Sequence, residues 1–154
     1  MADLDVAFVP TPKTIVQSML RLASLRRGET LFDLGAGDGR VIIEAARRFG
    51  ANAIGVEINP ASISRIRERL AATRTKAQLI EADMFKVDLT SADVITIYLS
   101  ASANTKLVPK LNAELKRGTR VVSLDYPLPG WQPKRELQVE ASGLSRTIYL
   151  YKKT

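Results

Sequence analysis

A glycine-rich turn between an apolar strand and a helical segment is the feature that most constrains how this chain can fold. The segment Gly35-Ala36-Gly37-Asp38-Gly39 follows the apolar run 30–34, and residues 41–49 after it have the apolar periodicity of a helix. Glycines at a strand-to-helix turn permit positive φ and let a ligand approach the backbone. The N–H groups that open the next helix favour a partly negative group. The pattern predicts a strand–turn–helix unit with a ligand at its turn.

The same alternation of strand and helix continues along most of the 154 residues. Apolar runs predict parallel strands at 30–34, 53–57, 78–81, 93–98 and 120–125. Two final runs, 136–140 and 147–151, flank Ala141-Ser142-Gly143-Leu144 and predict an antiparallel hairpin. The predicted fold class is therefore α/β. It is a Rossmann-like, doubly wound, mostly parallel seven-stranded sheet with helices on both faces and a C-terminal antiparallel hairpin.

Capping residues predict where the helices begin and end. Thr11 is expected to be an N-cap with Pro12 at the first helical position, and Gly28 is expected to end that helix. Asn59, before Pro60, is expected to cap a helix that runs to about residue 73. Leucines at 107, 111 and 115 predict a later helix that contains Pro109. This helix either starts near the proline or is kinked there.

Length and composition fit one globular domain. The chain is 45% apolar and 25% charged, which argues against disorder. We expect a lid and first helix in residues 1–28, a cofactor-binding core in 29–125, and a substrate loop with the hairpin in 126–154. The chain has no Cys and no His, so disulfides and thiolate nucleophiles are excluded and the commonest metal ligands are missing. No metal is expected.

The formal net charge of +7 is compatible with plain solubility or with an acidic partner such as nucleic acid. The first ten residues contain Asp3 and Asp5 and no basic region, so we do not expect a secretory signal. The longest uncharged run lies between Asp93 and Lys106 and is shorter than the ~20 residues that span a bilayer. We expect a cytoplasmic protein without a membrane segment.

A doubly wound sheet binds its ligand at the carboxyl ends of the strands. Glu57 ends the second strand 22 residues after Gly35, which is where an acid that holds a ribose diol is expected. The dinucleotide fingerprint requires a sixth-position glycine, but this chain has Arg40 there. Asp33 and Asp38 beside the turn would repel a pyrophosphate and attract an ammonium group. These residues favour S-adenosyl-L-methionine over NAD.

At this point the chain resembles the class I S-adenosyl-L-methionine-dependent methyltransferases. The resemblance rests on the glycine turn, on Gly55-Val56-Glu57-Ile58, on Glu81-Ala82-Asp83-Met84-Phe85 and on the fourth strand. It implies that S-adenosyl-L-homocysteine is the product, that Glu57 binds ribose and that Asp83 meets the adenine amino group. Arg40 is either a cofactor neighbour or a solvated residue, and Pro10-Thr11-Pro12 either forms a lid over the cofactor or only caps a helix. The expected cofactor-binding residues are Thr11, Pro12, Asp33, Gly35, Ala36, Gly37, Asp38, Gly39, Arg40, Glu57, Ile58, Asp83, Met84 and Tyr98.

Several classes of methyl acceptor are excluded or disfavoured by the residues. Methylation at C5 of a pyrimidine needs a Cys nucleophile, which this chain lacks. The Asn/Asp-Pro-Pro-Tyr/Phe motif of amide and exocyclic-amine methyltransferases is replaced by Tyr98-Leu99-Ser100-Ala101. The absence of His and of a carboxylate cluster disfavours a metal-assisted catechol-type site.

A closer resemblance is to a family of compact protein-lysine methyltransferases. It rests on Phe8-Val9-Pro10-Thr11-Pro12, on Val121-Val122-Ser123 and on the Pro-rich segment 127–133. The family includes small archaeal enzymes of broad range and mitochondrial enzymes that modify the ADP/ATP carrier and the ATP synthase c-subunit. The resemblance implies protein substrates with exposed lysines as partners.

Four residues are candidates for the acceptor side of that reaction. Tyr98 either orients the acceptor amine or packs in the core. Asp125 either receives a proton or caps a loop, and Tyr126 is expected beside it in the substrate channel. Trp131 either shapes the substrate side or packs the Pro-rich loop. An RNA or small-molecule methyltransferase and a non-catalytic cofactor binder remain alternatives.

Overall fold

A computed structural model describes residues 11–154 of the chain. Two predictions fall outside the described residues: the lack of a secretory signal in residues 1–10, and the share of Pro10 in a lid. Within residues 11–154, none of the helices combines the length and the apolar character needed to cross a bilayer.

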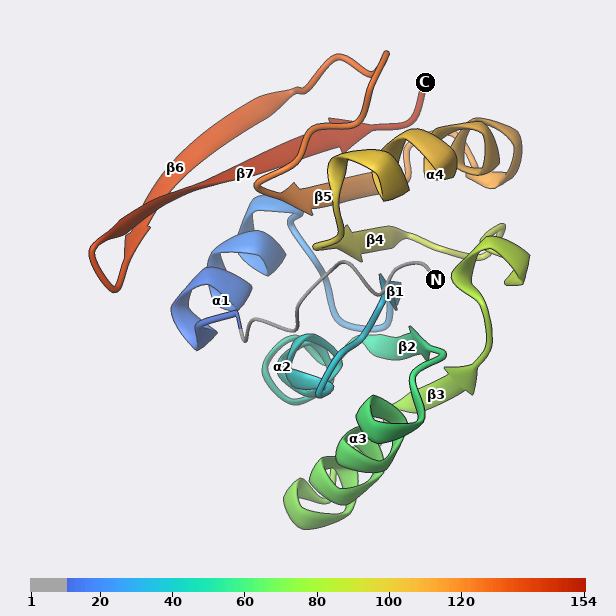
Figure 1. Cartoon of the computed structure of the whole chain (residues 1–154), viewed down its shortest axis with the longest axis vertical. Helices are drawn as coiled ribbons and strands as arrows, with labels where there is room; N and C mark the ends of the chain where they lie inside the picture. Colours follow the sequence, from blue (N-terminus) through green and yellow to red (C-terminus); the bar gives the residue numbers. More distant parts are fainter. Residues whose placement is uncertain (1–10) are drawn as a thin grey trace.

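One seven-stranded sheet forms the centre of the molecule, in the order β3-β2-β1-β4-β5-β7-β6 (Figure 1). Strands β1 to β5 pair in parallel, whereas β7 pairs antiparallel with both β5 and β6. The β6–β7 ribbon closes one end of the sheet (Figure 1). The predicted fold class is confirmed. The strands are β1 (Thr30–Leu34), β2 (Asn52–Glu57), β3 (Gln78–Glu81), β4 (Val94–Ile97), β5 (Arg120–Leu124), β6 (Arg135–Ala141) and β7 (Leu144–Lys152).

Helices cover both faces of the sheet because side chains on a strand alternate between its faces. On one face, apolar residues of α1 (Lys13–Leu22), α2 (Arg40–Phe49) and α3 (Pro60–Thr73) join a core with Leu31 and Val122. On the other face, α4 (Ala101–Glu114) and the short 3₁₀ helix η2 (Met84–Lys86) pack against Phe32 and Ile95. The sheet is thus packed on both faces, and the carboxyl ends of its parallel strands lie together at one edge.

The predicted ends of α1 are both wrong. Pro12, not Thr11, is the N-cap residue, because the Pro12 carbonyl accepts the first helical N–H group. The helix ends at Leu22, well before Gly28. It stops there because Ser24 adopts φ 53° and the Leu25 N–H donates to the Leu20 carbonyl, which is a Schellman closure.

The other helix and turn predictions fare better. The Asn59 side chain accepts hydrogen bonds from the N–H groups of residues 61 and 62, so the predicted cap of α3 is confirmed. Helix α4 begins at Ala101 and runs through Pro109, so it does not start near the proline. In the β6–β7 hairpin, Ser142 (φ 54°) and Gly143 (φ 77°) form the turn, and two positive φ angles suit the right-handed twist of the strands.

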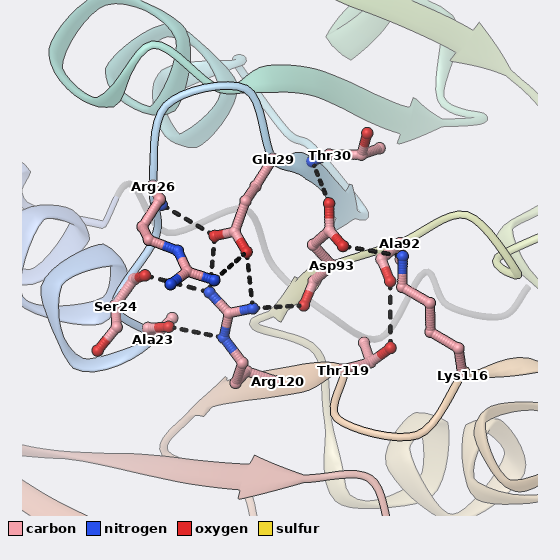
Figure 2. A network of polar contacts seen from close by, with 10 residues as sticks. All are labelled: Ala23, Ser24, Arg26, Glu29, Thr30, Ala92, Asp93, Lys116, Thr119 and Arg120. Carbon is pink, nitrogen blue, oxygen red and sulfur yellow. Dashed lines mark hydrogen bonds and ion pairs between the residues drawn. The ribbon is translucent and has the colours of Figure 1, made fainter.

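A polar network ties together the amino ends of three strands (Figure 2). The Arg120 guanidinium donates to both carboxylate oxygens of Glu29, at 2.7 and 3.0 Å, and its Nε donates to the Ala23 carbonyl at 2.9 Å. Asp93 accepts from the Thr30 N–H and pairs with Lys116 (Figure 2). Arg120 is the first residue of β5 and Thr30 is the first residue of β1, so the network fixes how these strands are positioned relative to each other along their length.

Replacement of Arg120 with Leu is expected to lower the free energy of unfolding by about 2–4 kcal/mol, because the poorly solvated Glu29 carboxylate would lose its two-point partner and keep the longer ion pair with the exposed Arg26. Urea denaturation measures the loss. Lys116→Ala is the matched control, since its ion pair with Asp93 is half exposed and should contribute less than about 1 kcal/mol. Equal losses in the two variants would contradict the role assigned to Arg120.

Candidate functional site

The carboxyl ends of β1, β2, β3 and β4 bring the predicted cofactor residues to one edge of the sheet. The glycine turn follows β1, and Glu57 is the last residue of β2. Asp83 comes just after β3, and Tyr98 directly follows β4. Because these strands are parallel and adjacent, the four segments lie side by side.

The glycine turn packs closely against Leu99 on one side and Gly55 on the other. Gly35 has φ 78°, and a Cβ atom there would lie 3.0 Å from Leu99 Cδ2. Gly55 on β2 carries no side chain where Ala36 Cβ approaches, since a Cβ at Gly55 would lie 3.0 Å from it. Gly37 (φ 63°) and Gly39 (φ 85°) continue the turn into α2. These positions require glycine, and they leave open space above the backbone at exposed Gly35.

Glu57 is held in place by backbone N–H groups. One carboxylate oxygen accepts from Gly37 at 2.8 Å, and the other accepts from Ile58 and Asn59, both at 3.1 Å. These bonds connect the turn after β1 with the end of β2. A carboxylate has roughly four acceptor positions, so Glu57 retains capacity for a hydroxyl donor.

Asp38 is paired within the turn by Arg40. The Arg40 guanidinium contacts both Asp38 oxygens, and its Nε lies 3.0 Å from Oδ1. Burial opposes ionisation of Asp38, but the hydrogen bonds and the charge of Arg40 outweigh it and lower its pKa. Arg40 also donates to the Thr11 carbonyl at 2.7 Å, so the segment containing Thr11 and Pro12 lies beside the turn.

Asp33 has a different environment, although it is only five residues away. Its side chain is buried, and its Oδ1 accepts from the Thr96 hydroxyl at 2.8 Å across the β1–β4 ladder. Within residues 11–154, the charged groups that act on Asp33 are the carboxylates of Glu57 and Asp38, and no cation is among them. Burial raises the pKa of Asp33 from its usual 3.8 to about 8, against the Thr96 hydrogen bond. A bound ammonium group would favour the ionised form.

The segments that follow β2 and β3 carry the residues expected on the adenine side of the candidate site. Asp83 accepts from the Phe85 N–H at 2.9 Å and so starts η2, which contains Met84. The Ala82 N–H donates to the Glu57 carbonyl at 3.1 Å, which keeps Asp83 near the end of β2. Ile58 is 64% exposed, which is unusual for a large apolar side chain at the end of a buried strand.

On the other side of the turn, Tyr98 and Asp125 are joined by a residue that sequence reasoning missed. Arg146 on β7 lies with its guanidinium 5.3 Å from the centre of the Tyr98 ring. The same guanidinium donates to Asp125 Oδ2 from Nε at 2.9 Å and pairs with it from Nη2 at 2.7 Å. Asp125 has φ 67°, and its N–H donates to the Thr147 carbonyl. Its carboxylate is therefore a counter-ion to Arg146.

Tyr126 lies at this edge, whereas Trp131 does not. Tyr126 is exposed, and its carbonyl accepts from the side chain of Asn104, a buried residue of α4 that also holds the Pro127 carbonyl. The indole of Trp131 donates to Asn112 near the end of α4 and packs edge-on against Tyr151. Trp131 packs against the core on the α4 face of the sheet, whereas Tyr98 packs against the core on the opposite face.

Three residues of the site carry no signal that sequence analysis could use. Thr96 is one β-branched residue in a strand rich in them, and Asn104 is a polar residue within a helix. Arg146 is one basic residue among 23. Each contact joins residues that lie far apart in the chain, so it forms only in the folded structure. In residues 11–154, acidic side chains do not gather into a group that could hold a metal ion.

Comparison with known proteins identifies the family of this chain. The ANTKMT methyltransferase domain matches residues 33–135. The chain belongs to this family. A protein-lysine N-methyltransferase of Saccharolobus islandicus is 43% identical over 152 residues, which cover 95% of this chain and 92% of the relative. An adenine nucleotide translocase lysine N-methyltransferase of Mus musculus is 35% identical over 84% of this chain, which spans only 57% of that relative.

One solved structure that this chain resembles contains S-adenosyl-L-homocysteine, the product of the expected cofactor. An RNA methyltransferase from Salinibacter ruber, crystallised with S-adenosyl-L-homocysteine, is 39% identical with a TM-score of 0.86. The alignment covers 94% of this chain and 93% of that one. This chain is an S-adenosyl-L-methionine-dependent methyltransferase with a Rossmann-like fold. The residues present fit that cofactor, because the edge combines open glycine backbone, an anchored carboxylate and a buried acid without a cation.

The raised pKa of Asp33 makes the stability of the cofactor-free protein depend on pH. The unfolded chain loses this proton near pH 4, but the folded chain keeps it until about pH 8, so Asp33 lowers stability progressively between these values. Asp33→Asn should therefore gain stability over the wild type as pH rises from 4 to 8, by at least about 1 kcal/mol at pH 8. Urea denaturation at several pH values measures this gain, and a constant difference would contradict it.

Proposed function

We propose that this methyltransferase transfers methyl groups to lysine side chains of proteins. The observation that carries the proposal is the 43% identity with the Saccharolobus islandicus protein-lysine N-methyltransferase over nearly the full length of both chains. The family match and the mouse relative, which is named for lysine methylation, support the same acceptor. We also propose a cytoplasmic protein that acts through one domain, with a lid and first helix (1–28), a core (29–125) and a substrate loop with hairpin (126–154).

In the proposed cofactor site, the carboxylates of Glu57, Asp33 and Asp83 each bind a different group of the cofactor. Glu57 accepts from the ribose hydroxyls, because its three backbone donors fix its orientation and leave acceptor capacity. Asp33 faces the α-ammonium, and Asp83 meets the adenine amino group between Ile58 and Met84. Gly35, Ala36, Gly37 and Gly39 let the cofactor approach the backbone. The Asp38–Arg40 pair holds Thr11 and Pro12 beside the cofactor as part of a lid.

The acceptor chemistry requires an uncharged amine. When bound, S-adenosyl-L-methionine would supply an electrophilic methyl group on a sulfonium: an amine nitrogen can bond to the methyl carbon while the C–S bond breaks and its electron pair goes to sulfur. A lysine of ordinary pKa near 10.4 is almost fully protonated at pH 7, so it must lose a proton to water first. Tyr98, at the end of β4, orients the amine, and Tyr126 lines the approach.

RNA is the second candidate acceptor. The Salinibacter ruber relative is named an RNA methyltransferase, and the net charge of +7 suits a polyanion. Against it, the sequence shows no basic stripe with interleaved aromatic residues. Lysine and RNA as acceptors would give different labelled products, so one experiment can distinguish them.

Incubation with methyl-labelled cofactor and separate protein and RNA fractions tests the acceptor. We expect label in protein that resists RNase and is recovered as methyl-lysine after acid hydrolysis. Label in RNase-sensitive material would replace the proposal with the RNA alternative. Tight cofactor binding without transfer to either fraction would make the chain a non-catalytic binder.

Glu57→Ala should weaken cofactor binding by about 1.5–3 kcal/mol, the range for hydrogen bonds to a charged group. Calorimetric titration with S-adenosyl-L-homocysteine measures the change. Glu68→Ala is the matched control, because Glu68 is an exposed acid on α3 away from the sheet edge. The variant should keep its helix content, and unchanged affinity would remove Glu57 from the site.

A further inference from the structure

Arg146 occupies a position where its charge can act on the acceptor. It is the third residue of β7, which runs antiparallel to β5, so it lies at the edge where β4 and β5 end. Ile148 and Leu150, on the same face of β7, belong to the core beneath α1 and α2, as does Tyr98. Arg146 therefore comes to Tyr98 from the face that carries Asp33 and Thr96.

The Arg146 side chain is fixed and mostly shielded from water. It is only 14% exposed, and two of its nitrogens contact Asp125 Oδ2. Asp125 Oδ1 accepts from the Thr147 N–H at 3.3 Å, and the Asp125 N–H donates to the Thr147 carbonyl at 2.7 Å. These bonds hold the ion pair beside the Tyr98 ring with little freedom. Asp125 keeps a left-handed φ of 67° to make them.

The other charged groups around Arg146 are few. Val139 lies opposite it on β6, and Leu137 and Ala141 flank Val139 on the same face without charge. The charged residues of α1, Lys13 and Arg21, are exposed. Asp33 lies further along the same face and is bonded to Thr96. Within residues 11–154, Asp125 and Tyr98 are thus the titratable groups that interact directly with the guanidinium.

We propose that Arg146 is a positioning residue that, together with Asp125, sets the fraction of acceptor lysine that is uncharged. The inference rests on the proposed lysine acceptor and its arrival at Tyr98. A guanidinium over the Tyr98 ring repels an ammonium more than a neutral amine, so it favours loss of the proton that must precede transfer. Asp125 opposes this effect and limits it. In the intact pair, the charge of Arg146 therefore favours loss of the proton from the amine and the charge of Asp125 opposes it.

Removal of one charge at a time should shift the pH dependence in opposite directions. At an effective dielectric constant of about 20, a unit charge about 8 Å from an amine changes its pKa by roughly 1.5 units, and salt reduces this. Arg146→Gln leaves Asp125 uncompensated and should move the midpoint of the rate profile up by about 0.5–1.5 pH units. Asp125→Asn leaves Arg146 uncompensated and should move the midpoint down by a similar amount.

The measurement is the single-turnover rate of methyl transfer to a lysine peptide, from pH 6 to 10, with enzyme and cofactor saturating. Arg146→Lys keeps the charge but loses the stacked, two-point geometry, so its midpoint should stay near that of the wild type even if its rate falls. Circular dichroism and calorimetric cofactor affinity check that each variant is folded.

The outcomes separate the two proposals. If the wild type fails to label lysine at any pH, the proposed function is wrong. If the wild type labels lysine but both variants shift the midpoint in the same direction, or lose rate without a shift, the pair has a merely structural role and the inference is overturned. Opposite shifts, with Arg146→Lys unmoved, support it.

Discussion

The hydrogen bonds that Glu57 accepts from Gly37, Ile58 and Asn59 are the interaction on which the site depends. They join the turn after β1 to the end of β2, so two segments separated by 20 residues behave as one rigid wall. Gly55 makes this junction possible, because any side chain there would collide with Ala36. The geometry of the turn is thus shared between two strands and does not belong to the glycine segment alone.

Three acids at the carboxyl edge differ in the group that each one contacts. Among residues 11–154, Asp38 pairs with Arg40 and Asp125 pairs with Arg146, whereas Asp33 accepts a hydrogen bond from the hydroxyl of Thr96. Asp38 and Asp125 are therefore each balanced by a guanidinium group, whereas Asp33 is held by a neutral hydroxyl group. Asp33 and Asp38, which look alike in the sequence, therefore differ in the structure: Asp33 is the acid proposed to face an ammonium group, whereas Asp38 fixes Arg40 and, through it, Thr11.

The two edges of the sheet serve different purposes. At the amino edge, Arg120 and Glu29 form a closed network with backbone carbonyls, which is suited to stability. At the carboxyl edge, strand ends, glycines and partly exposed side chains leave polar groups available to a ligand. The division follows from parallel strands, since their loops to the following helices all emerge on one side. The antiparallel β7 is the exception that brings Arg146 to the carboxyl edge.

The sequence by itself determined the α/β class, the run of strands and helices, the glycine turn, and Glu57 at the expected spacing. These features are local: hydrophobic periodicity, glycine placement and distance along the chain specify them without tertiary contacts. Only the tertiary structure decided that α1 ends at Leu22, that α4 passes through Pro109, that Trp131 packs against Tyr151 and that Arg146 meets Tyr98 and Asp125. Each of these depends on residues far apart in the chain or on packing that overrides a local preference. No pattern within one segment could have specified them.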